Sequence, residues 1–213
     1  MKAREGTVIV VDDDQSVRSA MEDLIGSLGF GIVTFASAAE YVASGPYAVP
    51  ACLVLDVKLP DMNGLELQRQ LAGRDHPPII FITGYGDIPS TVRAMKAGAV
   101  DFLSKPFDEQ QLLAAIESAM TRHRLEQSAQ AEVAELERRH ETLTPREREV
   151  LPLVVRGLLN KQVAASLGIS EVTLQIHRGN VMRKMQAESF ADLVRMSIKL
   201  GIAHSVEDEP RVP

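Results

Sequence analysis

Residues Thr7–Asp14 read TVIVVDDD and join a short apolar run to three consecutive carboxylates. A run that is apolar along nearly its whole length is typical of a strand covered on both faces, as in a parallel sheet flanked by helices. In open sheets of this kind, reactive groups gather beyond the carboxyl ends of the strands. This stretch therefore predicts both a parallel sheet and the edge at which a site should lie.

Four further β-prone runs follow, separated by helix-like segments such as Gln15–Leu28 and Asn63–Leu71. These runs are Gly31–Phe35, Ala51–Leu55, Ile79–Thr83 and Val100–Ser104. Strands that alternate with helices predict five βα units, and hence an α/β doubly wound five-stranded parallel sheet.

The composition is that of an ordinary globular protein. At 213 residues, with 45% hydrophobic and 24% charged, the chain has room for two small domains. No apolar run approaches the length of a membrane span or of a signal-peptide core, so we expect a cytoplasmic protein without a membrane partner. The single cysteine, Cys52, lies in an apolar run and is expected to be a buried hydrophobic residue.

The net charge of -6 is unevenly distributed along the chain. Residues 1–120 carry 9 Lys and Arg against 16 Asp and Glu, whereas residues 142–204 carry 9 against 5. An acidic half favours a metal ion or a cationic partner, and a basic half favours the phosphate backbone of a nucleic acid.

The ends of the predicted strands carry the side chains that suggest chemistry. They are Asp12, Asp13 and Asp14 after the first run, then Asp56, Thr83 and Lys105 after the third, fourth and fifth. Close carboxylates repel unless a cation balances them, and an oxygen-only set suits Mg²⁺. Asp56 can then attack a phosphoryl group while the metal and Lys105 neutralise its oxygens and Thr83 hydrogen-bonds the product.

These residues and their spacing resemble the receiver (CheY-like) domain over residues 6 to about 122. The matching stretches are VDDD at 11–14, LDVKLPDMNG at 55–64, ITGYGD at 82–87 and KAGAVDFLSKPF at 96–107. The resemblance implies that Asp13, Asp56 and the carbonyl of Lys58 bind Mg²⁺, while Asp12 acts mainly through the groups around the ion. It also implies that Asp56 receives phosphate from the phosphohistidine of a sensor histidine kinase.

The same resemblance implies a switch. Thr83 would move onto the new phosphoryl group, and Phe102 would turn into the space that Thr83 leaves. The Lys105–Pro106 bond would be cis. Lys58 and Tyr85, which flank the site, occupy variable positions in the family and would tune the dephosphorylation rate.

The second half of the chain has helical patterning. Residues 123–141 lack Gly and Pro and predict a helical linker, either solvated or paired in a short coiled coil. Beyond it, Thr144-Pro145-Arg146-Glu147 predicts a capping box, and Asn160 and Ser170 predict two further helix caps. We expect domains at residues 1–122 and 142–204, the second a small all-α four-helix helix-turn-helix domain, and a flexible tail at 205–213.

Residues 143–185 resemble the LuxR/FixJ-type DNA-binding domain, and the resemblance extends through Leu200. On a helix starting at Glu171, the residues Leu174, Val181 and Met185 share one side that should face the core. The opposite side, formed by Gln175, Ile176, Gly179 and Arg183, should read base edges in the major groove. The stripe between the two sides, formed by Thr173, His177, Asn180 and Lys184, should contact phosphates, and Arg178 could belong to either group. The expected DNA contacts are Thr173, Gln175, Ile176, His177, Arg178, Gly179, Asn180, Arg183 and Lys184.

Together these features predict a two-component response regulator. Phosphorylation at Asp56 is expected to remodel the segment from about Asp87 to Ser104 and to promote a homodimer that binds double-stranded promoter DNA. Through RNA polymerase the dimer is expected to activate transcription. The protein would not be an enzyme beyond its own phosphorylation and slow dephosphorylation.

Two other classes of function remain open. One is a phosphorelay or protein-interaction module whose helical domain no longer binds DNA. The other is a free-standing aspartyl-phosphate hydrolase, although the sequence has no insertion that would form a pocket for a small substrate.

Overall fold

The computed structural model describes residues 4–45, 47, 50–84 and 88–202. The chain divides into two compact units, Met1–Gln127 and Ser128–Pro213, and this boundary falls inside the predicted linker. Tyr85 and the predicted tail, 205–213, lie outside the described residues. No helix within the described part of the chain is both long and apolar enough to cross a membrane.

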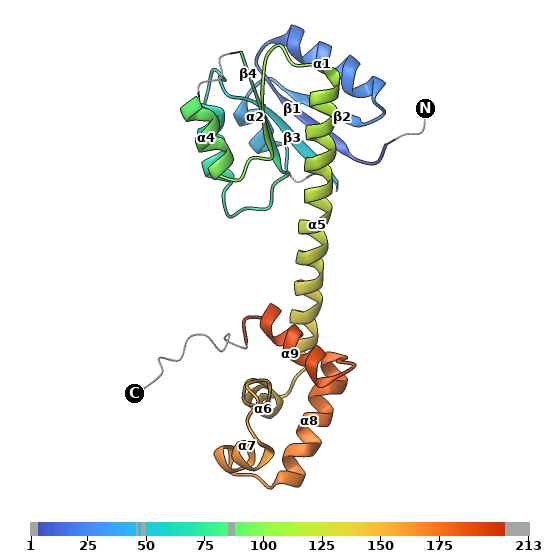
Figure 1. The fold of residues 1–213 in the computed structure, drawn as a ribbon, viewed down its shortest axis with the longest axis vertical. Coiled ribbons are helices and arrows are strands. Elements are labelled where there is room, and N and C mark those ends of the chain that lie inside the picture. Colours follow the sequence, from blue (N-terminus) through green and yellow to red (C-terminus); the bar gives the residue numbers. More distant parts are fainter. Residues whose placement is uncertain (1–3, 46, 48–49, 85–87, 203–213) are drawn as a thin grey trace. The chain divides into compact units, whose positions relative to one another are not determined.

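The first unit contains a five-stranded parallel sheet in the order β2-β1-β3-β4-β5, which confirms the predicted fold class (Figure 1). The strands are β1 (Thr7–Val11), β2 (Gly31–Phe35), β3 (Ala51–Asp56), β4 (Ile79–Thr83) and β5 (Asp101–Ser104). Their ends match the sequence prediction closely, since only β3 extends one residue further and β5 begins one residue later.

Helices cover both faces of the sheet, as the apolar strands require. On one face, α1 (Gln15–Ser27) and the first part of α5 (Glu109–Glu141) pack Ile25 and Ile116 against β1, β3 and β4. The helices of the other face are α2 (Ala38–Ala43), α3 (Gly64–Leu71) and α4 (Ile88–Lys96). Cys52 is fully buried in the first of these layers, as expected, and its burial raises the pKa of the thiol to about 12.

The register of the strands sets where their polar end residues lie. Val11 of β1 pairs with Leu55 of β3, so the residues that follow them, Asp12 and Asp56, come out side by side. Thr83 pairs with Ser104 on the neighbouring strands, which brings the residue after Ser104, Lys105, to the same edge.

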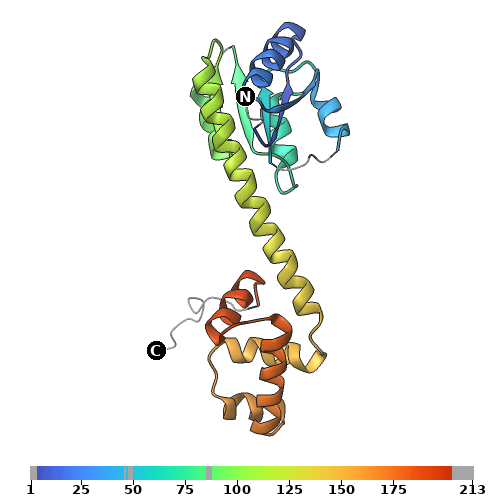
Figure 2. The same ribbon diagram turned by 90° about the vertical axis from the view of Figure 1, so that its right-hand side faces the viewer.

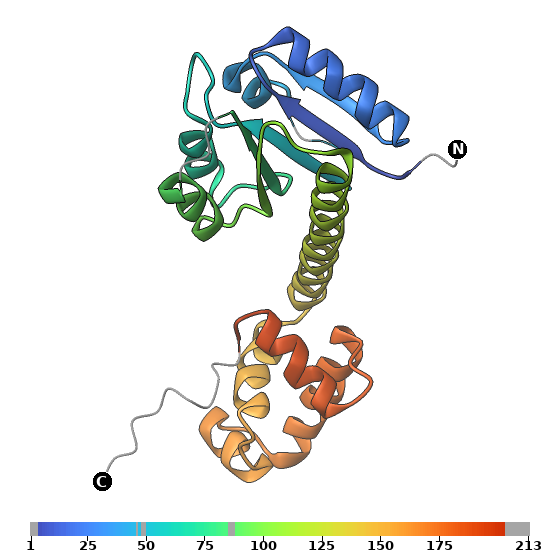
Figure 3. The same ribbon diagram turned by 45° about the horizontal axis from the view of Figure 1, so that its top comes forward.

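The second unit gathers four short helices into a small bundle (Figure 3). These are α6 (Pro145–Val155), α7 (Asn160–Leu167), α8 (Glu171–Met185) and α9 (Phe190–Lys199). The capping box at Thr144 and the cap at Ser170 form as predicted. Leu174, Val181 and Met185 of α8 are buried, which confirms the predicted inner side of this helix.

The predicted cap at Asn160 is wrong. Asn160 is the first residue of α7, and Leu159 occupies the N-cap position without a side-chain hydrogen bond to the helix. The Gln162 side chain instead accepts a hydrogen bond from the Leu159 amide, at 2.9 Å. The Asn160 side chain is therefore available to a neighbouring helix, where its Oδ1 accepts a hydrogen bond from Arg178.

Helix α5 is continuous over 33 residues and runs from one unit into the next (Figure 2). Its first part contributes Leu112 and Ile116 to the sheet's core, and Leu136 is buried within the second unit. Ser128–Glu132, between these two anchored parts, is exposed on all sides. The predicted helical connector thus exists, and a coiled-coil contact of this segment stays a prediction.

We expect Gly64→Ala to destabilise the first unit by about 1–3 kcal/mol because the new methyl group has no space. A Cβ at Gly64 would lie 2.5 Å from the carbonyl oxygen of Asp56 and 3.2 Å from the Phe81 ring. Urea unfolding followed by circular dichroism measures the change.

Gly26→Ala is the matched control, because a Cβ at Gly26, in the last turn of α1, meets nothing within 4 Å. This variant should be as stable as wild type or more stable by up to about 1 kcal/mol, since alanine favours the helix. Equal stability of Gly64→Ala and wild type would contradict the tight approach of α3 to β3.

Candidate functional site

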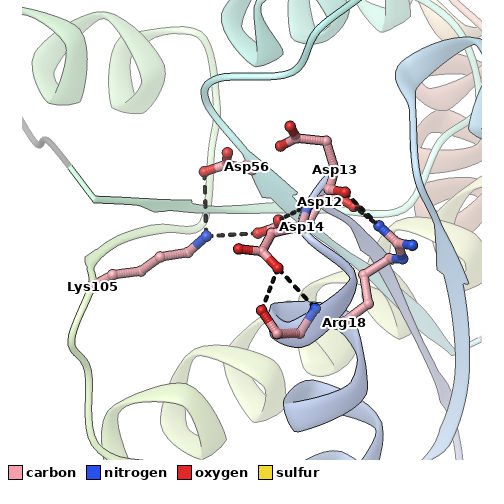
Figure 4. Close-up of polar contacts among 7 residues, drawn as sticks. Asp12, Asp13, Asp14, Arg18, Asp56 and Lys105 are labelled. Carbon is pink, nitrogen blue, oxygen red and sulfur yellow. Dashed lines mark hydrogen bonds and ion pairs between the residues drawn. The ribbon is translucent and has the colours of Figure 1, made fainter.

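Three carboxylates meet at the carboxyl edge of the sheet (Figure 4). Asp12 and Asp13 follow β1, Asp56 ends β3, and one oxygen from each lies within 4.8 Å of the other two. Asp12 and Asp56 are buried, whereas Asp13 is exposed. The structure therefore brings together the carboxylates that the sequence predicted as metal ligands, with an opening to solvent on the side of Asp13.

Lys105 joins this cluster from the end of β5. Its Nζ lies 2.6 Å from Asp12 Oδ2 and 3.7 Å from Asp56 Oδ1. The other Asp12 oxygen accepts a hydrogen bond from the Asp14 amide at 3.0 Å, so both oxygens of Asp12 have donors from the protein. The Lys105–Pro106 peptide bond is cis, as the resemblance implied.

Charge is not balanced at this edge, because one ammonium faces three carboxylates. Burial raises the pKa of Asp56, and the nearby charges of Asp12 and Asp13 raise it further against the opposing effect of Lys105. A cation bound among the three groups would relieve this repulsion, and oxygen-only donors suit Mg²⁺. The residues present therefore fit a magnesium ion.

Thr83 and Phe102 lie on neighbouring strands next to the cluster. Thr83 is 1% exposed at the end of β4, and its carbonyl oxygen accepts a hydrogen bond from the Lys105 amide at 2.7 Å. The Phe102 ring is partly buried, with its centroid 6.0 Å from that of Phe81. Thr83 thus lies at the same sheet edge as Asp56, Phe102 lies on the next strand, and their switch roles stay predictions.

The loop after Asp56 is held by contacts that the sequence did not reveal. The backbone of Lys58 bridges that of Asn63, and the Asn63 side chain caps α3 by accepting from the Leu65 amide. Asp61 accepts hydrogen bonds from the amides of Ala38 and Ala39, in the first turn of α2, at 3.3 and 2.9 Å. These contacts fix the stretch that carries Lys58, whose carbonyl the resemblance assigns to the metal.

Arg18 is a second residue that sequence reasoning missed. It lies one turn into α1, and its Nη1 donates to the carbonyl oxygens of Asp12 and Asp13 at 2.7 and 2.9 Å. Asp14 caps this helix, because its side chain accepts a hydrogen bond from the Ser16 amide at 2.8 Å. Only the spacing of an arginine six residues after Asp12 could have suggested the Arg18 contact.

In the second unit, α8 presents the predicted base-reading side to solvent. Gln175, Ile176, Gly179 and Arg183 are all exposed, and Ile176 is 60% exposed although it is apolar. An exposed isoleucine on a helix whose opposite side is buried is consistent with a surface that another molecule covers.

Residues of the stripe predicted to contact phosphates, and Arg178 beside it, bond other residues of the helical bundle, which the sequence did not reveal. Lys184 Nζ lies 2.7 Å from Glu147, and the Arg178 guanidinium bonds Asn160 and stacks over the Phe190 ring at 5.4 Å. Asn180 accepts from Arg183 at 3.2 Å.

Thr173 and His177, the other members of this stripe, are partly buried. The Thr173 hydroxyl lies 2.9 Å from that of Ser170. Among the described residues, His177 Nδ1 is a buried ring nitrogen without a hydrogen-bond partner. DNA contacts by this stripe stay predictions, and those of Arg178 and Lys184 require sharing or exchange of their present partners.

Two family profiles match the chain, one for each unit. The profile described as the response regulator receiver domain matches residues 8–117, and that of the bacterial regulatory proteins of the luxR family matches residues 141–197. The two matches cover the acidic cluster and the helical bundle respectively.

Relatives and solved structures resemble the chain over almost its whole length. Nodulation protein W of Bradyrhizobium diazoefficiens is 53% identical over 96% of this chain and 91% of its own. Response regulator protein TodT of Pseudomonas putida is 45% identical over 94% and 88%. The structure of response regulator StyR has a TM-score of 0.77 at 47% identity, over 92% of this chain and 100% of that one.

We expect Asp13→Asn to weaken Mg²⁺ binding by roughly tenfold or more, because the variant removes an ionised oxygen ligand. A titration with MgCl₂, followed by amide shifts in ¹⁵N NMR spectra of the full chain, measures the affinity. Asp14→Asn is the matched control: it removes the same charge one residue away, and asparagine caps a helix as well as aspartate does. Equal losses in the two variants would show that only net charge matters.

The ion pair between Glu147 and Lys184 should make the second unit sensitive to acid. Burial raises the pKa of Glu147, but hydrogen bonds from Lys184 and from Thr144 outweigh it and leave the pKa below its ordinary value of 4.5. A lowered pKa stabilises the fold above pH 4.5, and this contribution is lost as the pH falls through the lowered pKa.

Accordingly, Glu147→Gln should destabilise the second unit at pH 7 by about 1–3 kcal/mol and should lose less stability than wild type on acidification. Urea unfolding at pH 7 and at a pH below 4.5, read from NMR signals of α6, provides the measurement. A wild-type unit with the same acid sensitivity as Glu147→Gln would contradict a stabilising ion pair.

Proposed function

Because the chain belongs to the response regulators whose receiver domain is followed by a LuxR-type DNA-binding domain, and is a phosphorylation-dependent transcription regulator, we propose that Asp56 is its phosphate acceptor. The observation that carries this proposal is the position of Asp56 within 4.8 Å of two further carboxylates and 3.7 Å from Lys105.

Phosphoryl transfer at Asp56 is a displacement. A carboxylate oxygen of Asp56 attacks the phosphorus of a phosphohistidine on the kinase, the P–N bond breaks, and the histidine leaves with its electron pair. Asp13, Asp56 and the Lys58 carbonyl, with Asp12 beside them, would hold Mg²⁺, which would supply charge neutralisation. Lys105 is close enough to Asp56 to donate to a phosphoryl oxygen.

The new dianion then acts on the neighbouring strands. The Thr83 hydroxyl hydrogen-bonds the phosphoryl group, and Phe102 fills the space that Thr83 leaves. β5, which carries Phe102, packs against α4, whose exposed Ile88, Val92 and Met95 form an apolar stripe at helical spacing. We propose that phosphorylation presents this stripe to a second copy of the chain, because burial in a dimer stabilises exposed apolar side chains.

The dimer then binds two half-sites on promoter DNA in the cytoplasm and activates transcription through RNA polymerase. In this scheme Gln175 pairs with an adenine edge, Ile176 contacts a thymine methyl group, and Gly179 allows close approach. Arg183 lies on the same exposed side. The stripe formed by Thr173, His177, Asn180 and Lys184 contacts phosphates, which position the helix without reading the sequence, and Arg178 contacts either a phosphate or a base edge.

The decisive variant is Asp56→Asn. Wild-type protein given a small acyl phosphate and Mg²⁺ should incorporate one phosphoryl group per chain, should double in mass on sizing, and should bind promoter DNA more tightly. Asp56→Asn should do none of these, because the amide is not a nucleophile. Intact-mass spectrometry, light scattering and genome-wide footprinting measure the three effects.

Several outcomes would contradict parts of this scheme. Phosphate retained by Asp56→Asn would mean that another residue is the acceptor, and an unchanged mass after phosphorylation would remove the dimer. DNA binding that does not weaken steeply as salt rises would argue against phosphate contacts.

A further inference from the structure

Arg18 makes an unusual pair of contacts beside the acidic cluster. A single nitrogen, Nη1, donates to two successive backbone carbonyls, those of Asp12 and Asp13 (Figure 4). The guanidinium is partly buried, and these bonds are 2.7 and 2.9 Å long. Hydrogen bonds from a charged donor are stronger than those between neutral groups. Arg18 therefore holds the backbone of both acidic residues at once.

This backbone needs such support because it connects two elements without belonging to either. The pairing of β1 with β3 ends at Val11, and α1 begins at Gln15. The Asp12 side chain is fixed by Lys105 and by the Asp14 amide. The Asp13 carboxylate is exposed, so the position of its backbone sets where the carboxylate lies. The carbonyl oxygen of this backbone accepts a hydrogen bond from Arg18.

We propose that Arg18 is a positioning residue of the magnesium site, one that aims the Asp13 carboxylate by fixing the peptide groups of Asp12 and Asp13. This inference rests on the proposed role of the three carboxylates in binding Mg²⁺. Loss of a group that positions a metal ligand typically lowers metal affinity by roughly 10–100-fold.

The charge of Arg18 alone has the opposite effect. A guanidinium near the cluster repels a cation, so its removal by itself should tighten Mg²⁺ binding. If Arg18 acts by positioning, its removal should weaken Mg²⁺ binding instead. The sign of the change therefore distinguishes the two roles.

Two variants of the full chain separate these effects. Arg18→Met removes the donors and the charge but keeps a good helix former in α1, and Arg18→Lys keeps the charge on a shorter stem. MgCl₂ titrations followed by amide NMR shifts should give about a tenfold weaker affinity for Arg18→Met. Arg18→Lys should lie between Arg18→Met and wild type, because one ammonium at shorter reach restores the carbonyl bonds only in part.

A kinetic measurement separates positioning from general damage. With acetyl phosphate as donor, the Mg²⁺ concentration for half-maximal phosphorylation should rise in Arg18→Met, while the rate at saturating Mg²⁺ stays close to that of wild type. Arg69→Met is the matched control, since Arg69 is exposed on α3 and pairs only loosely with Glu66, at 3.5 Å. It changes the net charge equally and should leave both quantities unchanged.

The outcomes are distinct. Tighter Mg²⁺ binding by Arg18→Met, or an affinity equal to that of wild type, would overturn the positioning role while leaving the proposed function intact. A fall in the saturated rate together with reduced thermal stability, without a change in Mg²⁺ affinity, would also overturn it. Wild-type protein that binds no Mg²⁺ and takes up no phosphate would overturn both proposals.

Discussion

The carboxylates of Asp12, Asp13 and Asp56 repel because they are held within 4.8 Å of one another, and the properties of the first unit's site follow from that repulsion. This repulsion follows from the parallel register of the strands, which brings Asp12 and Asp56 to the same edge of the sheet. Lys105 offsets only part of the negative charge, and the pKa of Asp56 stays raised. A metal ion or a phosphoryl group therefore changes the balance of forces at an edge where β3, β4 and β5 all end. The proposed phosphorylation of Asp56 would therefore influence several elements together.

The fold was largely predictable because each of its elements is specified locally. Runs such as Thr7–Val11 and Ile79–Thr83 are apolar except for one terminal threonine each, and the structure begins and ends both strands at the predicted residues. Thr144 and Ser170 cap helices as their chemistry requires. Asn160 was misread because asparagine is a good cap, yet tertiary contact with Arg178 occupies its side chain and leaves Leu159 at the cap position.

The site was predictable only in part. Asp12, Asp13, Asp56, Thr83 and Lys105 could be found because strand ends converge by rule. Contacts that join distant parts of the chain leave no such pattern: Lys184 and Glu147 are 37 residues apart, and Asp61 reaches back 22 residues to Ala39. These pairs depend on side-chain directions that emerge only when the elements pack, so the sequence could name the reacting groups but not the residues that hold them.

Helix α5 draws its anchoring from two separate cores. Leu112 and Ile116 are buried in one and Leu136 in the other, whereas Ser128–Glu132 is exposed and buries no side chain, its Glu132 making only a surface ion pair with Lys199. Short helical segments without tertiary packing are marginal in water, so this stretch depends on both of its ends remaining ordered. Loss of structure in either core frays the helix toward the other. The two halves of the protein are thus thermodynamically linked through about one and a half turns, and these turns are the natural first point of proteolytic attack.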